Sequence, residues 1–303
     1  MRNYGNKLKK WLDKHAHAIL IAPYVILFIL FVLLPIILAI VLSFTNYNGF
    51  QTPDITFLSN YIRAFTQDAV FMQKILPNTI IYAVVVGPGG NLLSFIMAWI
   101  LSQLTKGVRN VLAIILYLPS LMAGVMVSTV WQAVFAGDRV GYLNNFLLQM
   151  GFISAPIDWL QSTTYLMPIV IIVALWSSMG IGFLSMLSGL LNVDREQYEA
   201  AMIDGVSNRM QEIIYVTIPN IRSQMLFGAV MAIVNTFNTT GLGVALSGSN
   251  PTPQYAGSLL VNHIDDFGFI RYEMGYASAL SVILLLIMWL ASKLAFRLFG
   301  DKE

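Results

Sequence analysis

Residues 199–219, EAAMIDGVSNRMQEIIYVTIP, form a polar stretch between two long apolar runs. Upstream, no Lys, Arg, Asp or Glu occurs from Thr163 to Val193, and downstream none occurs from Ser223 to Ile264. A charged stretch between apolar runs of this length lies in water beside a bilayer, because charged side chains are costly within the hydrocarbon. It is longer than a minimal hairpin loop needs, so we expect it to be folded and to bind a partner.

The composition indicates that most of the protein surface faces lipid. Of the 303 residues, 57% are apolar and 11% are charged, with a mean hydropathy of +0.71, whereas a soluble domain carries about 25% charged residues. The chain has no cysteine, which excludes disulfides, thiolate nucleophiles and thiolate metal ligands. The basic residues 1–18 precede an apolar run too long for a signal-peptide core, and we interpret them as a retained cytoplasmic anchor.

Six apolar segments are long enough to cross a membrane, since about 20 helical residues span roughly 30 Å of hydrocarbon. They are expected at residues 19–44, 78–104, 110–135, 165–191, 224–246 and 276–296. Each is expected to be helical, because lipid offers no partner to backbone amides and the alternating pattern of a membrane barrel is missing. The predicted fold class is therefore an all-α polytopic membrane protein.

The distribution of Lys and Arg predicts that both chain ends lie in the cytoplasm. With six alternating spans and the N-terminus inside, 13 of the 17 basic residues fall on the cytoplasmic side. The four outside are Arg63, Lys74, Arg139 and Arg271. The predicted organisation is a cytoplasmic N-terminus at 1–18, a six-helix membrane domain at 19–298 with the polar segment 194–222 in the cytoplasm, and a cytoplasmic tail at 299–303.

The run Gly87-Pro88-Gly89-Gly90 lies inside the second predicted span. Proline removes a helical hydrogen bond, and glycine lets a neighbouring backbone approach closely. We therefore expect either a kink or a tight helix contact here, and we favour tight packing over a gating hinge.

The polar segment itself reads as two short helices joined by a glycine turn. Asp194 followed by Gln197 predicts an N-cap with a capping-box partner, and residues 198–203 then form the first helix. Gly205 breaks this helix, because glycine adopts turn conformations at least steric cost. A second amphipathic helix is expected at 208–217, with Met210, Ile213, Ile214 and Val216 as its apolar positions, and Pro219 is expected to stop it.

Glu199-Ala200-Ala201, then Asp204-Gly205, then Ile218-Pro219 resembles the EAA loop of permease subunits in binding-protein-dependent ABC importers. The resemblance implies that Glu199, Ala200, Ala201, Asp204, Gly205 and Pro219 belong to a coupling loop that docks into a groove of a cytoplasmic ATPase. Here Pro219 follows Gly205 by 14 positions, one more than the usual spacing, and Val206 stands where Ala is common. The extra residue is expected to lengthen or bulge the second helix.

Further fragments, in order along the chain, are similar to carbohydrate-uptake permeases of this family. They are Ala22-Pro23-Tyr24, Ser43-Phe44-Thr45-Asn46, Asn78-Thr79, Tyr117-Leu118-Pro119-Ser120, Trp131, Gly141-Tyr142-Leu143-Asn144 and Gly275-Tyr276-Ala277-Ser278-Ala279. The chain resembles the subunit type related to the larger maltose-transporter permease, without that protein's extra N-terminal spans and large periplasmic insertion. The resemblance implies a type I importer permease in the bacterial cytoplasmic membrane. Its implied partners are a second homologous permease, expected to be a different chain, two cytoplasmic ATPase subunits that use ATP, and an external solute-binding protein.

Neutral polar residues inside the predicted spans are candidates for the substrate path. Asn235 and Asn238 are three positions apart on the fifth span and so share a face, with Thr239 next to them, and Trp176 lies in the fourth span. Amides, hydroxyls and an indole suit a sugar, which offers hydroxyl groups and an apolar ring face. The alternative role for these polar groups is hydrogen bonding within or between helices.

Several functions are disfavoured. No G-x-x-x-x-G-K-[ST] motif occurs, so any ATPase is another polypeptide, and no catalytic constellation or cofactor site is present. His263 beside Asp265 and Asp266 is interpreted as loop polarity rather than a metal site, and nothing indicates nucleic-acid binding. The alternative function is a stand-alone secondary transporter or channel for a neutral polar solute. It is disfavoured because no charge lies deep in a span and no inverted repeat is evident.

Overall fold

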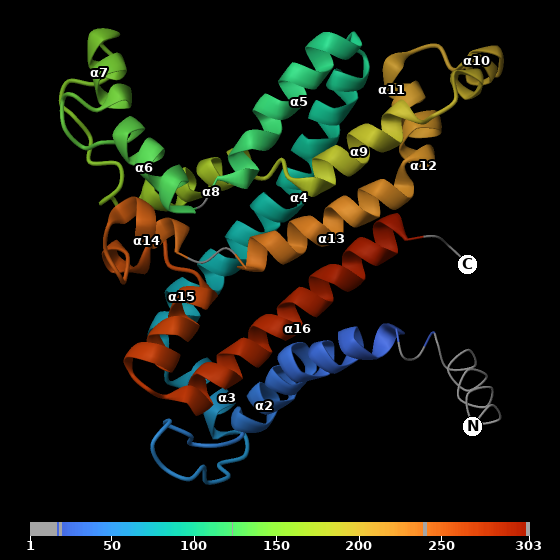
Figure 1. Ribbon diagram of the computed structural model, residues 1–303. Coiled ribbons are helices and arrows are strands. Elements are labelled where there is room, and N and C mark those ends of the chain that lie inside the picture. Colours follow the sequence, from blue (N-terminus) through green and yellow to red (C-terminus); the bar gives the residue numbers. More distant parts are fainter. Residues whose placement is uncertain (1–16, 18–19, 123, 239–240, 301–303) are drawn as a thin grey trace, which may run out of the picture.

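Helices joined by loops make up the part of the chain that the computed structural model describes, residues 17, 20–122, 124–238 and 241–300 (Figure 1). Its α-helices are α2 (Leu34–Leu42), α3 (Ser59–Thr66), α4 (Leu76–Ser102), α5 (Lys106–Leu121), α6 (Gly124–Val134), α7 (Tyr142–Gln149), α8 (Leu166–Trp176), α9 (Ile181–Leu191), α10 (Arg195–Ile203), α11 (Arg209–Glu212), α12 (Ile218–Asn220), α13 (Arg222–Asn238), α14 (Leu242–Ser247), α15 (Leu260–Asp265) and α16 (Met274–Phe299). Wider π-helical turns occupy Ile29–Leu33, Phe71–Ile75, Ile213–Thr217 and Asp266–Ile270, and a 3₁₀ turn occupies Pro253–Tyr255. Within the described ranges, extended pairing is limited to one isolated bridge between Thr45 and Ile55. The all-α prediction is confirmed.

Within the described ranges, three helices are long and apolar enough to cross a membrane without interruption. They are Leu20–Leu42, Phe71–Ser102 and Met274–Phe299, which correspond to the first, second and sixth predicted spans. The second helix begins seven residues before the predicted start at Asn78, because the π-helical turn Phe71–Ile75 continues directly into α4. Lys74 is exposed in this extension. Because the prediction was based on uncharged apolar runs, it placed the start of the helix after this charged residue.

The third and fourth predicted spans are each broken into two helices. α5 and α6 meet at an angle of 101°, and α8 and α9 meet at 42°. Pro119 lies in the last turn of α5, where proline disfavours continuation. Between α8 and α9, Gly180 has an extended backbone that no helix contains (φ −101°, ψ −143°). The prediction of continuous helices over 110–135 and 165–191 is therefore wrong.

The fifth predicted span, 224–246, is also divided. α13 has 17 residues, and α14 begins after Gly241, which adopts a left-handed conformation (φ +76°). Counting each bent pair as one span gives five spans in the described ranges. α13 is not among them, because its 17 residues extend about 26 Å, less than the roughly 30 Å of hydrocarbon. The count of six spans stays a prediction.

The centre of the protein is a tight packing of α4, α9 and α13. Gly182 of α9 faces Gly228 of α13, where a Cβ on Gly182 would lie 2.9 Å from the Cα of Gly228. A Cβ on Gly90 of α4 would lie 2.9 Å from the Cβ of Ser178. α4 runs through Pro88 as one helix, so the Gly87–Gly90 run serves close packing, the interpretation favoured from the sequence.

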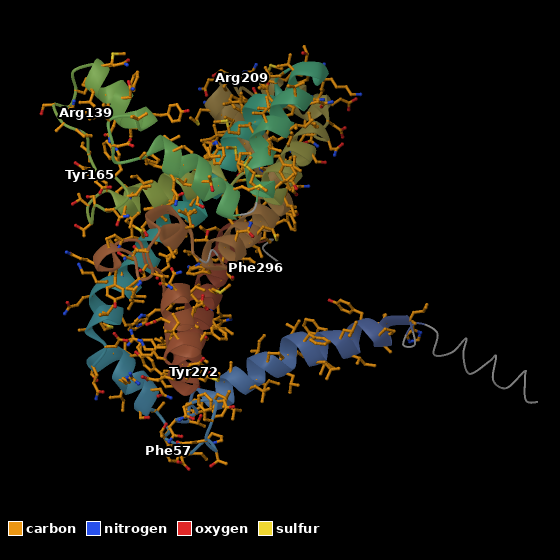
Figure 2. All side chains as sticks on the ribbon, turned by 60° about the vertical axis from the view of Figure 1, so that its left-hand side comes forward. Phe57, Arg139, Tyr165, Arg209, Tyr272 and Phe296 are labelled. Atoms are coloured by element: carbon orange, nitrogen blue, oxygen red, sulfur yellow. The ribbon has the colours of Figure 1, made fainter. Side chains whose placement is uncertain are left out.

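The two ends of the molecule are built from different segments. In Figure 1, α10 and the ends of the first and last helices nearest the termini lie to the right, whereas α3, α7, α14 and α15 lie to the left. This distribution places the three long connections, around 45–77, 136–164 and 247–275, at the end opposite α10. Figure 2 shows the N-terminal helix projecting away from the others; α2 packs against α16 and has no buried residue.

Candidate functional site

The first candidate site is the segment 194–222, which we call the coupling segment. α10 begins after Asp194, as predicted, but the Asp194 side chain makes no capping hydrogen bond. The backbone N–H of Gln197 instead donates to the Asp194 carbonyl at 3.2 Å. The N-cap position is therefore confirmed, whereas the side-chain capping box is not formed.

Gly205 ends α10 in a glycine turn. Its φ is +97°, a conformation that favours glycine. The Val206 N–H donates to the Ala201 carbonyl at 3.0 Å, and the Gly205 N–H donates to the Met202 carbonyl at 3.3 Å. These two bonds form a Schellman motif, which satisfies carbonyls at the helix end that would otherwise lack partners. The predicted break at Gly205 is confirmed.

The second helix of the coupling segment contains a bulge. Asn208 caps α11 by accepting the Gln211 N–H at 2.9 Å, and the π-helical turn Ile213–Thr217 then leads into α12. A π-helical turn holds one more residue than an α-helical turn, so the bulge accommodates the long spacing between Gly205 and Pro219. This continuous helix ends at Asn220, one residue after Pro219, so it stops next to the proline as predicted.

The coupling segment presents a polar and apolar surface to water. Glu199, Ala200 and Asp204 are exposed, and Ile203 is 87% exposed. A groove of about 1280 Å³ separates α10 and α11 from residues 102–109, and Glu199 lines it. Its other charged lining residues are Lys106, Arg109, Arg195, Arg209 and Glu212, of which the last two form an ion pair at 2.8 Å.

Two contacts connect the coupling segment to the membrane helices. Val216 is buried, and Ile213 packs on the cluster around Phe183 and Met186. The Arg222 Nε–H donates to the Phe299 carbonyl at 3.1 Å, which caps the end of α16. Of the four apolar positions predicted for the second helix, Met210 and Ile214 are exposed instead.

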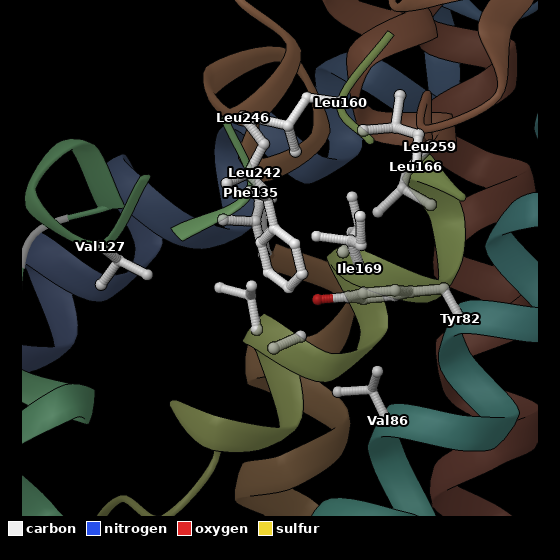
Figure 3. Close-up of a cluster of buried hydrophobic side chains, with 13 residues drawn as sticks. Tyr82, Val86, Val127, Phe135, Leu160, Leu166, Ile169, Leu242, Leu246 and Leu259 are labelled. Carbon is white, nitrogen blue, oxygen red and sulfur yellow. The ribbon is translucent and has the colours of Figure 1, made fainter. Parts of the chain in front are cut away.

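The second candidate site is a central cavity of about 600 Å³ between α4, α5, α8 and α13. Its polar lining residues are Tyr82, Ser120, Ser177, Ser178, Asn235 and Thr236. No charged side chain lines it among the described residues. Figure 3 shows the apolar cluster beside the cavity, in which the Tyr82 ring lies among residues such as Ile169 and Val86. The arrangement offers hydroxyl and amide groups beside apolar surface.

The structure places some of the predicted path residues in this cavity. Asn235 lines it, whereas Asn238 ends α13 with its side chain outside the described part, and Thr239 lies wholly outside it. Trp176 lines a smaller pocket of about 270 Å³ instead, which shares Pro119 and Met122 with the cavity.

Two serines show the alternative role expected for polar residues in spans. The Ser177 hydroxyl donates to the Val173 carbonyl at 3.0 Å, and the Ser178 hydroxyl donates to the Leu175 carbonyl at 2.7 Å. Tyr82, Ser120 and Thr236 were missed as lining residues by sequence reasoning. Thr236 follows Asn235 directly in the sequence, and this neighbouring position was the signal that could have identified it as a lining residue.

A polar network lies at the end opposite the coupling segment. His263 is 5% exposed, and its Nε2 lies 2.9 Å from Asp68 Oδ2, which also accepts the Tyr276 hydroxyl at 2.8 Å. Burial opposes ionisation of Asp68, but hydrogen bonds from His263, the Phe71 N–H and Tyr276 outweigh it and lower the Asp68 pKa to about 2. The interpretation of His263 as loop polarity is therefore wrong: it is a buried partner of a residue 195 positions away.

Ion pairs surround this network. Arg63 bonds Glu273, which raises the Arg63 pKa above its usual range, and its guanidinium lies 4.3 Å from the Tyr276 ring centroid. Asp266 pairs with Arg271 at 2.7 Å. No group of three or more His, Asp or Glu side chains suited to a metal ion occurs in the described ranges.

Comparison with known proteins gives consistent matches over most of the chain. Residues 90–300 match the family model described as "Binding-protein-dependent transport system inner membrane component". The chain is similar to the probable ABC transporter permease protein YesP of Bacillus subtilis, with 30% identity over 94% of this chain and 90% of that one. It is also similar to the arabinooligosaccharides transport system permease protein AraP of Bacillus subtilis, with 29% identity over 95% and 90%.

A solved structure shares the fold. It is that of a bacterial alginate ABC transporter in complex with an alginate pentasaccharide-bound periplasmic protein. One of its chains matches with a TM-score of 0.78 and 21% identity, over 100% of this chain and 99% of that one.

Proposed function

The chain belongs to the family of binding-protein-dependent transport system inner membrane components, and on that premise we propose that it conducts a neutral sugar or oligosaccharide through the central cavity. As a member it is a multi-pass permease subunit of an ABC importer in the cytoplasmic membrane, and its partner ATPases hydrolyse the ATP. The family match overturns the alternative of a stand-alone transporter or channel.

The observation that carries the sugar proposal is the chemistry of the cavity. Asn235, Thr236 and Ser120 offer neutral donors and acceptors beside the apolar surface of Val86 and Leu242. A polyhydroxylated ring needs both kinds of contact. The printed function of the arabinooligosaccharide relative supports the same substrate class.

For the topology we propose six spans, with both termini and the coupling segment in the cytoplasm. The Lys and Arg distribution supports this orientation. So does the position of α10, which lies on the same side of the molecule as the membrane-helix ends nearest the termini and opposite α3, α7 and α15 (Figure 1). The corresponding organisation is a cytoplasmic N-terminus at 1–18, a permease domain at 19–298 and a tail at 299–303.

The coupling segment is proposed to dock on an ATPase. Exposed Glu199 offers a negative charge at the groove, Ala200 and Ala201 let a partner approach closely, and Gly205 sets the direction of α10. Asp204 and Pro219 flank these contacts. The partners proposed for the full importer are a second, different permease chain, two ATPase subunits and an external solute-binding protein that delivers the sugar.

The cavity is tested with Asn235→Ala in the assembled importer. Sugar uptake is expected to fall while complex yield and basal ATPase activity persist, because the change removes an amide that lines the cavity. Asn192→Ala serves as the control, since the side-chain amide of this exposed asparagine donates to the Ser188 carbonyl of its own helix. Normal uptake in the double variant Asn235→Ala/Asn238→Ala would reject the path role.

The topology is tested by cysteine labelling, which the cysteine-free chain permits directly. An impermeant maleimide added to intact cells is expected to label Gln149→Cys on α7 but not Ser207→Cys in the coupling segment. Labelling of Ser207→Cys in intact cells would reverse the proposed orientation.

A further inference from the structure

A polar pocket of about 390 Å³ lies beside the coupling segment, where the end of α9 meets α10, α12 and the start of α13. We call it the inner pocket. It is distinct from the groove between α10, α11 and residues 102–109, since Val193 is the one lining residue that the two share. Apart from Asp194, its polar lining residues in the described part of the chain carry neutral hydroxyls and amides. The central cavity has the same chemistry.

The lining of the inner pocket divides into an exposed mouth and a partly buried interior. Asn192, Asp194 and Asn220 are exposed at the mouth, and the side-chain amides of the two asparagines donate to carbonyls of their own helices. Ser185 and Gln224 are partly buried. Ser185 precedes Asn192 by about 10 Å of helix, so the pocket reaches that far from the coupling segment into the membrane helices.

Gln224 carries a hydrogen-bond acceptor without a donor. Its Oε1 is buried and makes no hydrogen bond within the described ranges. Its stem is fixed against α9, because a Cβ on Gly189 would lie 3.0 Å from the Gln224 Cγ. A buried acceptor without a donor is costly, so a ligand hydroxyl that reaches this oxygen would be bound favourably.

A second acceptor of this kind lies toward the central cavity. Asn91 of α4 is 8% exposed, and its Oδ1 also makes no hydrogen bond among the residues that the structure describes. It faces α13 one helical turn beyond Gln224, because a Cβ on Gly228 would lie 3.0 Å from this oxygen. Asn235, at the cavity, is the next polar group along the same helix face. Neutral polar groups therefore mark the route from the inner pocket to the cavity, over about 16 Å of α13.

We propose that the inner pocket is a second sugar subsite, which the transported sugar occupies between the central cavity and the cytoplasm. This subsite rests on the sugar path proposed for the cavity and extends it. One sugar hydroxyl donates to Gln224 Oε1, and another accepts from the Ser185 hydroxyl. Because these contacts are few and uncharged, a sugar can bind there and leave again, as stepwise conduction requires.

The test places Ser185→Cys in the cysteine-free chain and uses the complete importer, solubilised in detergent without nucleotide. The rate at which a small maleimide modifies this chain is measured over a series of concentrations of arabinotriose or lactose, whichever the importer takes up faster. We expect saturable protection, with modification about tenfold slower at ten times the half-protecting concentration. Ser207→Cys in the coupling segment is the control and should react at one rate throughout.

Gln224→Met tests the buried acceptor. Methionine keeps an unbranched stem against Gly189 and removes the amide, so the half-protecting concentration should rise by about 2- to 10-fold, the effect of one neutral hydrogen bond. Gln67→Met makes the same change at an exposed position next to α3, at the opposite end of the molecule, and should leave that concentration unchanged. Complex yield is measured for both variants, so that a loss of assembly is distinguished from a loss of sugar binding.

Three results would overturn the proposal. Modification of Ser185→Cys at the same rate with and without sugar would mean that the inner pocket binds none. A cysteine that stays unmodified under both conditions would mean that a partner chain fills the pocket in the assembled importer. An unchanged half-protecting concentration in Gln224→Met would remove the buried acceptor from contact with sugar.

Failure of the inner pocket is distinguishable from failure of the cavity. Reduced uptake in the Asn235 variants without protection of Ser185→Cys would overturn the inner pocket alone. Normal uptake in those variants would reject the cavity role, whereas protection of Ser185→Cys would still support the inner pocket as a sugar site.

Discussion

Replacement of Gly205 by alanine isolates the contribution of one turn to coupling. Gly205 has φ +97°, and a Cβ built on it meets no atom within 4 Å. The substitution therefore creates no clash, and its cost is that of a left-handed backbone, about 1–2 kcal/mol. A difference of this size changes the equilibrium between formed and opened turn by about 5- to 30-fold.

The expected consequence is uncoupling rather than misfolding. α10 would point away from the ATPase in a larger fraction of molecules, while the membrane helices remain packed. In proteoliposomes holding the complete importer, sugar taken up per ATP hydrolysed should fall in the order Gly205, Gly205→Asn, Gly205→Ala, Gly205→Val. Asparagine tolerates positive φ better than alanine does, and a β-branched residue tolerates it least. Gly205→Pro should uncouple most strongly, because its φ is fixed near −65°.

Gly151 provides a matched control at the opposite end of the molecule. It ends α7 with φ +72°, and a Cβ there also meets nothing within 4 Å. Gly151→Ala carries a comparable backbone cost without affecting the coupling segment. Equal amounts of sugar taken up per ATP hydrolysed in Gly151→Ala and Gly205→Ala would refute the reasoning. A higher value in Gly205→Ala than in Gly205→Asn would refute it as well.

Glu199→Lys should weaken ATPase association in co-purification more than Glu199→Gln, because it replaces attraction by repulsion; unchanged association in both variants would remove Glu199 from the interface. Asp68 has a folded-state pKa of about 2, below an unfolded value of about 3.9, so the stability it contributes is present above about pH 4 and is lost as the pH falls toward 2. Thermal denaturation should show this loss in the native chain, and Asp68→Asn should be less stable at neutral pH but lack that loss. Gly182→Ala should destabilise the complex in detergent by about 1–3 kcal/mol, because its methyl group would lie 2.9 Å from the backbone Cα of Gly228. Gly107→Ala, which meets nothing within 4 Å, should melt like the native chain, and equal melting of the two variants would contradict the packing argument.

Local signals predicted the coupling segment well. Asp194 begins α10 and Gly205 ends it, because a cap and a left-handed glycine act over a few residues and leave a mark in the sequence. The bulge expected from the long Gly205–Pro219 spacing is present at Ile213–Thr217. The absence of the expected Asp194 side-chain bond was not predictable, since that bond depends on a rotamer.

The interrupted helices were not predictable from apolarity. Residues 165–191 are apolar on both sides of Gly180, so composition cannot distinguish one straight span from two helices at 42°. The same limit applies at Gly241, where the break depends on what the helix end packs against. Pro119 was a visible signal for the α5 break, but proline is also tolerated within membrane helices.

Long-range pairs were hidden for a different reason. His263 appeared beside Asp265 and Asp266 in the sequence, yet its partner is Asp68. Tyr82 reaches the cavity only because α4, α8 and α13 meet there. Contacts between residues so distant along the chain follow from helix packing, which no local pattern encodes.

Because α13 is one continuous helix, a small tilt at its start becomes a larger displacement at its end. Helix α13 is separated from α12 by Ile221, a fully buried residue beside the Arg222–Phe299 contact. Asn235 lies 14 residues further along, which corresponds to about 20 Å of helix. A tilt of about 10° at Ile221 would move Asn235 sideways by about 3.5 Å, more than the length of one hydrogen bond. The same tilt would move Gly228, halfway between Ile221 and Asn235, by about half as far. Because α4 and α9 pack tightly on α13 there, the three helices would have to move together.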